Sequence, residues 1–285
     1  MKETVTSQED YVLGTHDQEI SRLGLQHLVW RPRVLAAWQS AEIGSGQTVL
    51  DVGCGPGYAS LDLAELVGPS GVVVAIDKSG RFLEALDTMR QQRGIGNVTA
   101  HKADLDGDEF PAVAADRVWC RWVLAFVKHP RDLLAGVAAA LKPDGVIVLH
   151  EYFDYSTWRA IPPCGDLEEF VGAVMASWRD NGGEPDIGLW LPGWLEELGF
   201  ELRAARPIVD IVQRDHMLWS WLRTFLEVGR QRLVDLGYLS ASRAVSMWDA
   251  FSRFESTPGS RMITPALLEI VAARRAAIPN TDQSA

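Results

Sequence analysis

The sequence has little cysteine and no long apolar run. Its three cysteines, Cys54, Cys120 and Cys164, are far apart and odd in number, so they suggest neither a disulfide framework nor a metal site. We therefore expect a reduced, cytoplasmic setting. No segment approaches the roughly 18 apolar residues that a membrane span requires. Residues 1–10 are polar and lack the apolar stretch of a secretion signal, so no membrane association is expected.

Basic residues are also scarce. The chain has 27 Lys and Arg against 38 Asp and Glu, a net charge of −11, and its basic residues are dispersed among acids. A nucleic-acid partner is not expected without a local basic patch. Apolar residues make up 47% of the 285 residues, which excludes a disordered chain and suffices for one large domain or a core with a cap.

The most informative stretch is Thr48–Gly57, T-V-L-D-V-G-C-G-P-G. An apolar run ends there in three glycines at alternate positions, Gly53, Gly55 and Gly57. This pattern predicts a buried parallel strand that turns sharply into a helix. Glycine allows positive φ and close approach of a ligand, and the amides at the helix start would face that ligand. A tight turn without a ligand fits the same pattern.

Three further motifs follow in order. The run Val72–Ile76 ends in Asp77, where an acid can bind ribose hydroxyls in a doubly wound fold. Ala103-Asp104-Leu105 comes where a third strand should end, and its carboxylate could accept from an exocyclic amine with the leucine against a purine. Residues 141–145, L-K-P-D-G, indicate a helix stop that leads into another buried strand.

In order and spacing, these motifs resemble the class I S-adenosylmethionine-dependent methyltransferases over about residues 40–155. One departure is Asp144-Gly145, where the family usually has two glycines in a turn that does not touch the cofactor. The resemblance implies an α/β fold, with a Rossmann-like, doubly wound, seven-stranded and mostly parallel sheet that carries helical lid insertions. It also implies S-adenosyl-L-methionine as the cofactor.

Expected elements follow from hydrophobic periodicity and turn residues. The expected strands are Thr48–Val52, Val72–Ile76, Val98–Lys102, Arg117–Trp122, Val146–Glu151, Glu201–Val212 and Met262–Ala272. The last is antiparallel by resemblance, and Thr264-Pro265 inside it suggests an edge or a bulge. The expected helices are Tyr11–Trp38, Tyr58–Val67, Ser79–Arg90, Asp132–Leu141, Leu167–Trp178, Leu191–Leu198, Met217–Leu236 with Asp215 as its cap, and Ser240–Phe254.

Three parts are expected along the chain. Residues 1–40 would form an N-terminal helical lid, and residues 41–151 the cofactor-binding core. Residues 152–285 would complete the sheet and carry two cap insertions, at about 152–190 and 215–256. Nine of the eleven tryptophans lie outside residues 48–148, so the parts that would cover the site are rich in aromatic surface.

The resemblance also assigns roles to residues. It places Gly53, Gly55 and Gly57 beside the amino-acid part of the cofactor, Asp77 and the adjoining Lys78 at the ribose, and Ala103, Asp104 and Leu105 at the adenine. For Lys78 a solvated side chain is the favoured reading. Asp51 would orient the glycine loop or meet the cofactor's amino group, or else be a buried acid satisfied by backbone amides.

Two other parts of the chain contribute candidates. Tyr11 and the R-L-x-x-Q pattern ending at Gln26 resemble family members whose first helix covers the cofactor; a helix merely docked on the sheet is the alternative. Arg121 follows the fourth strand. It would bind the cofactor carboxylate or pair with an acid such as Glu151, and the structural ion pair is the favoured reading.

No general base is evident. Methyl transfer requires an acceptor held near the methyl, exclusion of water and removal of a proton where the acceptor demands it. His27, His150, Glu151 and His216 are candidates by position only. Strand alternation puts His150 and Glu151 on opposite faces, so at most one faces the crevice. An amine or an acidic phenol needs no base.

The sequence therefore predicts a methyltransferase acting at O, N or C of a small, apolar or aromatic acceptor beneath the cap insertions. One alternative is a cofactor-binding protein without transferase activity. A second is a nicotinamide-dependent oxidoreductase, although the last glycine is shifted to Gly57 and Ala103–Leu105 has no role in that scheme. The insertions leave room for a homodimer contact without showing one.

Overall fold

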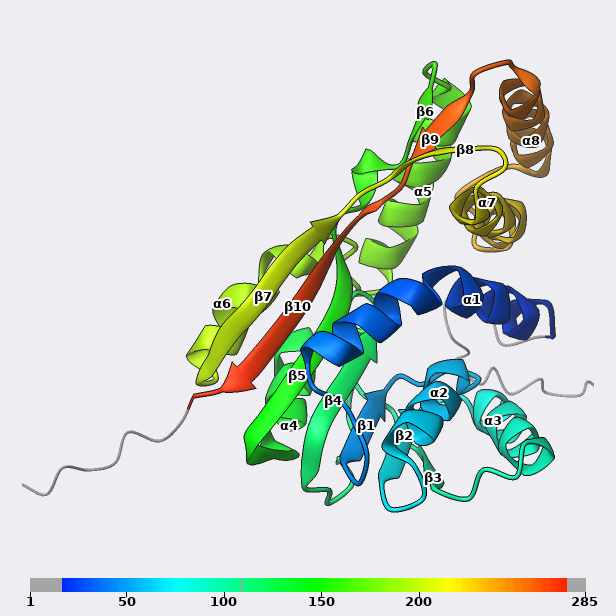
Figure 1. The fold of residues 1–285 in the computed structure, drawn as a ribbon. Coiled ribbons are helices and arrows are strands. Elements are labelled where there is room, and N and C mark those ends of the chain that lie inside the picture. The colour runs from blue at the N-terminus through cyan, green and yellow to red at the C-terminus, as the bar shows by residue number, and fades with distance from the viewer. Residues whose placement is uncertain (1–16, 109, 276–285) are drawn as a thin grey trace, which may run out of the picture.

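A computed structural model describes residues 17–108 and 110–275. Its centre is a seven-stranded sheet in the order β3-β2-β1-β4-β5-β10-β7 (Figure 1). All neighbouring pairs from β3 to β5 are parallel, whereas β10 is antiparallel to both of its neighbours. The strands are β1 (Thr48–Val52), β2 (Val72–Asp77), β3 (Val98–Lys102), β4 (Ala115–Arg121), β5 (Leu141–Asp154), β7 (Phe200–Ile208) and β10 (Ala266–Arg274). The predicted fold class is confirmed.

Helices cover both faces of this sheet because successive strand residues point to opposite sides. In β1, Val49 belongs to one buried cluster and Leu50 and Val52 to the other. The first cluster includes α1 (Asp17–Ser40), α2 (Tyr58–Val67) and α3 (Gly80–Gln92). The second includes α4 (Pro130–Ala139) and α6 (Leu191–Glu197), which follows the short 3-10 turn η2 (Ile187–Leu189).

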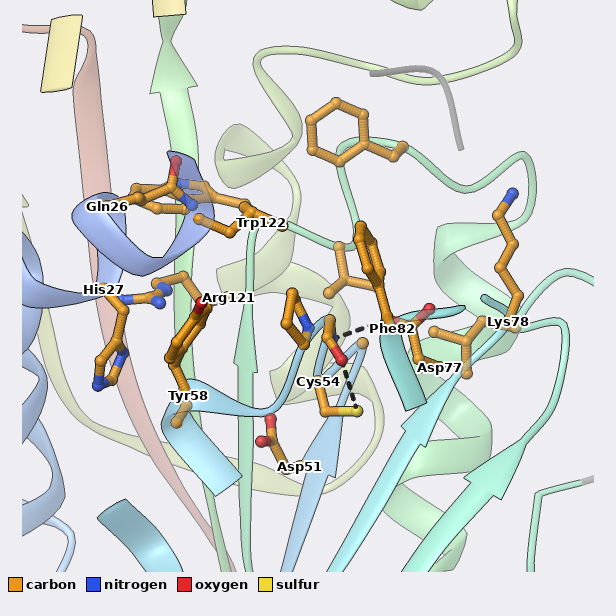
Figure 2. Close-up of a pocket in the computed structure, with 18 of the residues that line it drawn as sticks. Gln26, His27, Asp51, Cys54, Tyr58, Asp77, Lys78, Phe82, Arg121 and Trp122 are labelled. Carbon is orange, nitrogen blue, oxygen red and sulfur yellow. Dashed lines mark hydrogen bonds between the residues drawn. The ribbon is translucent and has the colours of Figure 1, made fainter. Parts of the chain in front are cut away.

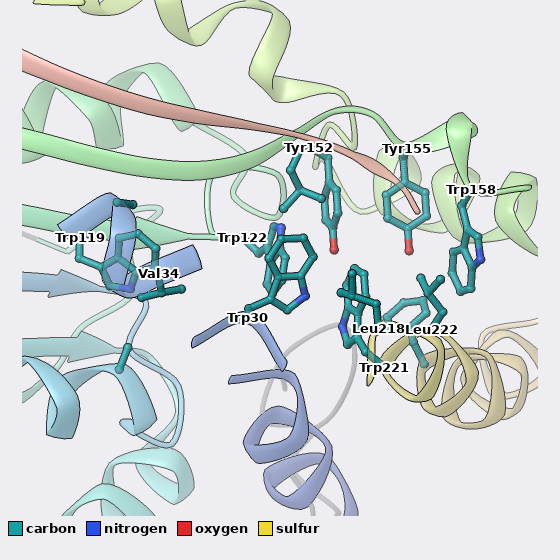
Figure 3. Close-up of a cluster of buried hydrophobic side chains, with 14 of the residues drawn as sticks. Trp30, Val34, Trp119, Trp122, Tyr152, Tyr155, Trp158, Leu218, Trp221 and Leu222 are labelled. Carbon is teal, nitrogen blue, oxygen red and sulfur yellow. The ribbon is translucent and has the colours of Figure 1, made fainter. Parts of the chain in front are cut away.

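A helical cap stands over the carboxyl ends of the strands. It comprises α5 (Gly165–Asp180), α7 (Met217–Asp235) and α8 (Ala241–Ser256), beside a three-stranded sheet in the order β6 (Arg159–Ile161), β9 (Arg261–Ile263) and β8 (Ile211–Gln213). A 3-10 turn, η1 (Tyr155–Thr157), leads into β6. Aromatic residues of α1, β5 and α7 meet where the cap joins the main sheet (Figure 3).

Helix α1 lies between the sheet and the cap (Figure 1). Its second half is anchored by Trp30, Val34 and Trp38, which are all fully buried. At the middle of the helix, Asp62 of α2 binds it twice, accepting from His27 Nε2 at 3.0 Å and from Arg31 Nε at 2.6 Å. These contacts fix the helix above the glycine-rich turn.

Two predicted strands each divide in two. The expected strand Glu201–Val212 becomes β7 and β8, and Met262–Ala272 becomes β9 and β10, in different sheets. The breaks face each other: Asp210 N donates to Thr264 Oγ1 at 3.0 Å, and Thr264 N donates to Asp210 O at 2.9 Å. The chain passes from one sheet to the other at this pairing, so Thr264-Pro265 marks a strand junction.

Smaller differences concern element ends. The cap of α7 is His216, whose Nδ1 accepts from Leu218 N at 3.2 Å, and not Asp215. Strand β5 begins at Leu141, ahead of Pro143, because Leu141 pairs with Ala115 of β4. Tyr11 lies outside the described residues. Among the residues described, no helix combines the length and apolarity needed to cross a membrane.

Candidate active site

A pocket opens at the carboxyl ends of β1, β2 and β4, beneath α1 (Figure 2). Its floor is the glycine loop, whose Gly53, Gly55 and Gly57 have φ values of 66°, 55° and 85°. A Cβ at Gly53 would lie 2.3 Å from Val123 Cγ2, and one at Gly57 would lie 2.3 Å from Leu86 Cδ1. A Cβ at Gly55 would meet nothing within 4 Å, so this residue faces open space. Gly53 and Gly55 line the pocket. Gly57 does not line it and is required by the turn, because its φ is positive and Leu86 packs against it.

Asp77 joins the glycine loop to the next helix. Its Oδ2 accepts from Gly55 N and its Oδ1 from Ser79 N, both at 2.8 Å. Burial raises the pKa of this carboxyl, while the two amides act in the opposite direction. Each oxygen keeps a further lone pair for a ligand hydroxyl. Lys78 also lines the pocket.

The far end of the pocket fits a flat, partly polar group. Asp104 and Leu105 line it as expected, whereas Ala103 does not and instead donates its amide to Asp77 O at 3.1 Å. Phe82 and Asp106 line the same end and were not among the predicted site residues. Phe82 is also buried within α3, and helical spacing alone does not distinguish a core position from a pocket position.

Asp51 lies deeper, at 2% exposure, and also lines the pocket. Its Oδ2 accepts from Ser60 Oγ at 2.5 Å, so a hydroxyl, and not backbone amides, satisfies it. Burial raises its pKa to about 6, and nearby Arg121 acts in the opposite direction. An ammonium group in the pocket would therefore find a buried carboxylate.

Arg121 has no ion pair within the described residues. The expected partner, Glu151, instead accepts from Val123 N at 2.7 Å and Leu124 N at 2.9 Å. The guanidinium lies 5.7 Å from the ring centre of Trp119 and 5.0 Å from that of Trp122, and burial lowers its pKa to about 10. The favoured reading of a structural ion pair with Glu151 is therefore wrong. Arg121 lines the pocket without an ion pair among the described residues, while the charge of Asp51 favours its protonated form.

Four residues of α1 line the pocket, namely Arg22, Leu23, Gln26 and His27. Gln26 Oε1 accepts from Arg22 Nη1 and from Trp221 Nε1, both at 3.0 Å, and so connects α1 to α7. The Arg22 charge is balanced by Glu19, at 2.7 Å. This placement agrees with a helix that covers the site.

One side of the pocket is an aromatic wall, made of Trp122, Phe126, Tyr152, Trp178 and Phe225. Trp122 has φ of 52° and stacks on Tyr152, with ring centres 5.5 Å apart, and on Trp221, at 5.7 Å (Figure 3). Phe126 and Phe225 were missed as site residues, because only the folded cap brings them together. A planar apolar molecule suits such a wall.

The candidate bases are mostly engaged elsewhere. His150 is fully buried, with Nε2 3.1 Å from Glu269, and His216 caps α7. Neither His150 nor Glu151 is among the residues that line the pocket. His27 does line it, but Asp62 binds its Nε2 and burial lowers its pKa.

Comparison with known proteins agrees with this geometry. A family model described as a methyltransferase domain matches residues 43–179. Nocamycin O-methyltransferase of Saccharothrix syringae is 36% identical over 104 residues, 36% of this chain and 37% of that protein. Aklanonic acid methyltransferase of a Streptomyces species (strain C5) is 30% identical over 163 residues, 57% of this chain and 71% of that protein. The match to the nocamycin enzyme thus spans little more than a third of its length.

Solved structures share the fold at low identity. Coclaurine N-methyltransferase, bound to N-methylheliamine and S-adenosylhomocysteine, has a TM-score of 0.55 and 19% identity, covering 85% of this chain and 72% of that one. The cyclase SpnF has a TM-score of 0.53 and 17% identity, covering 86% and 81%. The chain belongs to the class I S-adenosylmethionine-dependent methyltransferases. This assignment displaces the nicotinamide-dependent alternative.

S-adenosylmethionine is the cofactor of this family, and the pocket fits it. The open space above Gly55 admits a ligand against bare backbone. The guanidinium of Arg121 could bind the carboxylate of the cofactor. The carboxylate of Asp51 could bind the ammonium group of the cofactor. Within the two described ranges, no cluster of three or more His, Cys, Asp or Glu side chains could hold a metal.

Proposed function

We propose that this chain transfers a methyl group from S-adenosylmethionine to a small, apolar or aromatic acceptor. The observation that carries the proposal is one continuous pocket, with the glycine loop at its floor and the aromatic wall at its side. The cofactor supplies an activated methyl on a sulfonium. The chain must bind the cofactor, place the acceptor in line and exclude water.

In this proposal the polar residues bind the cofactor. Asp77, with Lys78 beside it, accepts from the ribose hydroxyls, and Asp104 and Leu105 receive the adenine. Arg121 binds the carboxylate and Asp51 the ammonium group. The glycine loop and Gln26 enclose the amino-acid part. Opposite charges at Arg121 and Asp51 match the two charges of an amino acid, which supports this orientation.

The aromatic wall receives the acceptor. Its rings offer flat apolar surface. The charged groups that lie over these rings are the guanidinium groups of Arg22, 5.5 Å from the ring centre of Phe225, and of Arg121, 5.0 Å from that of Trp122, and neither is a general base. We therefore expect an acceptor that attacks without strong base assistance, such as an amine, a carboxylate or an acidic phenol or enol. The names of the relatives include O- and C-methyltransferases, and the structural neighbours an N-methyltransferase, so the accepting atom stays open.

We extend the proposal to the organisation of the chain. Residues 1–40 act as a lid, residues 41–151 bind the cofactor, and 152–285 complete the sheet and roof the acceptor. We expect an enzyme of the cytoplasm that acts on small molecules and not on nucleic acid. Size-exclusion chromatography with light scattering will show whether it is a homodimer.

Transfer can be tested with methyl-labelled S-adenosylmethionine and three matched probes, 1-naphthol, 1-naphthoic acid and 1-naphthylamine, alongside a small-molecule cell extract. We expect label to enter an organic-soluble small molecule. Asp77→Ala should weaken cofactor binding, measured by calorimetry, and reduce transfer in parallel. If the cofactor binds at micromolar levels but label reaches none of these acceptors, the chain is better described as a cofactor-binding protein without transferase activity. The fold is compatible with that outcome, because a cyclase shares it.

A further inference from the structure

Residues 122–126 form a turn directly after β4 that carries much of the pocket. Trp122, Val123 and Phe126 all line it. Phe126 N donates to Val123 O at 2.9 Å, which closes the turn. As at the start of a helix, the first amides of such a turn find no carbonyl of their own. Val123 N and Leu124 N donate instead to Glu151 Oε1, at 2.7 and 2.9 Å.

Glu151 occupies a costly position for an acid. It lies in β5, is fully buried, and its Oε2 has no hydrogen-bond partner among the described residues. Burial raises its pKa to about 8, against the opposing effect of the turn amides. Within residues 17–108 and 110–275 its hydrogen bonds go to the turn, so the turn is the physical reason for an acid at this point.

The turn fixes two surfaces at once. On one side, Val123 packs directly against Gly53 of the glycine loop, where even a Cβ would not fit. On the other, Trp122 takes a left-handed backbone conformation that puts its ring between Tyr152 and Trp221. Such a conformation in a bulky residue is unfavourable and persists only where its surroundings impose it.

We propose that Glu151 is a positioning residue, whose carboxyl oxygen holds the 122–126 turn so that Val123 closes the glycine loop and Trp122 forms the aromatic wall. Glu151 acts through the turn and does not touch the cofactor or the acceptor. The effect on the acceptor rests on the proposed function. The effects on the turn and on binding of the cofactor product do not, so the two can fail separately.

The experiment combines hydrogen exchange with calorimetry, using S-adenosylhomocysteine as the probe. In the wild-type protein, the amides of Val123 and Leu124 should exchange slowly despite having no backbone acceptor. Glu151→Ala should speed the exchange of these amides by ~10-fold or more, because two buried amides lose their acceptor. It should also raise the Kd for S-adenosylhomocysteine by about tenfold. Glu151→Gln keeps one acceptor oxygen in a side chain of the same shape and should restore both values to within about threefold of wild type.

Glu269→Ala is the matched control. Glu269 is a buried acid on the adjacent strand β10, where it pairs with His150 and Arg206 instead of the turn. Its loss should lower thermal stability but leave exchange at Val123 and Leu124 unchanged. Fast exchange of these amides in the wild type would overturn the proposal without any variant. So would a Glu151→Gln protein that behaves like Glu151→Ala, or a control that loosens the turn equally.

Discussion

Arg121 provides the sharpest test of how the cofactor lies in the pocket. The guanidinium is mostly buried, lies beside two tryptophan rings and has no ion pair among the residues described. If it binds the cofactor carboxylate, Arg121→Met should weaken S-adenosylhomocysteine, which has that carboxylate. The affinity for 5′-methylthioadenosine should not change, because this ligand has the same nucleoside and thioether but no amino-acid part.

The expected size follows from the bond that is lost. A hydrogen bond to a charged group contributes about 1.5–3 kcal/mol, which corresponds to roughly 10- to 150-fold in Kd. The free protein should not lose stability, because the substitution removes a cation that has lost water without gaining an ion pair. We expect an unfolding midpoint within about 2 °C of wild type or higher.

Calorimetry at pH 8 is the appropriate assay, since Asp51, with a pKa of about 6, is then ionised in the wild-type protein. Loss of the Arg121 charge raises that pKa, so the comparison is repeated at pH 9. Arg117→Met is the control, on the same strand but at its other end, where Arg117 Nε donates to Ala41 O. Equal losses for both ligands, or unchanged affinity for S-adenosylhomocysteine, would refute the carboxylate assignment. Equal losses would moreover place Arg121 against the nucleoside that both ligands share, with the cofactor lying the other way round.

Three further results are expected. Burial raises the pKa of Asp51 from its ordinary 3.8 to about 6, so the folded protein holds this proton more tightly than the unfolded chain does. The stability of the free protein should therefore fall as the pH rises from 4 to about 6. Over the upper part of that range, ionised Asp51 should strengthen S-adenosylhomocysteine binding by about tenfold per pH unit. Asp51→Asn should abolish that pH dependence in isothermal titrations, and a slope that survives the substitution would assign it to another group. Gly57→Ala should destabilise the fold by about 2 kcal/mol or more in urea unfolding, because its φ is 85° and its Cβ would meet Leu86. Gly55→Ala meets no clash but has a φ of 55°, so it should cost about 1–2 kcal/mol of stability and also weaken binding of the cofactor product. Asp62→Asn should weaken the attachment of α1, with faster hydrogen exchange in that helix and ~3- to 10-fold weaker S-adenosylhomocysteine; an unaffected helix would show that its buried tryptophans alone fix it.

The parallel half of the sheet could be predicted from the sequence because its signals are local. Strands buried on both faces appear as short apolar runs, and glycines mark the sharp turns that follow them. Thr48–Val52 and Val98–Lys102 have the predicted bounds, and Val72–Ile76 extends by one residue, to Asp77. The glycine loop and Asp77 meet at one end of the sheet for the same reason, since parallel strands end on the same side.

The antiparallel half could not be predicted in the same way. The sequence predicts one strand in each of the runs 201–212 and 262–272, yet each run divides between two sheets where Asp210 and Thr264 bind each other. A break that depends on two residues 54 positions apart leaves no local pattern. The aromatic wall has the same origin, because Trp122, Tyr152, Trp178 and Phe225 come from four separate parts of the chain.

The sequence by itself determined the parallel half of the sheet and its glycine loop, where strand, turn and carboxylate follow one another within a few residues. Only the tertiary structure decided which charges find partners: Glu151 binds the amides of a turn, and Arg121 is left facing the pocket. The physical reason is that a buried polar group takes whichever partner the packed chain brings within about 3 Å, and that choice depends on distant residues as much as on near ones.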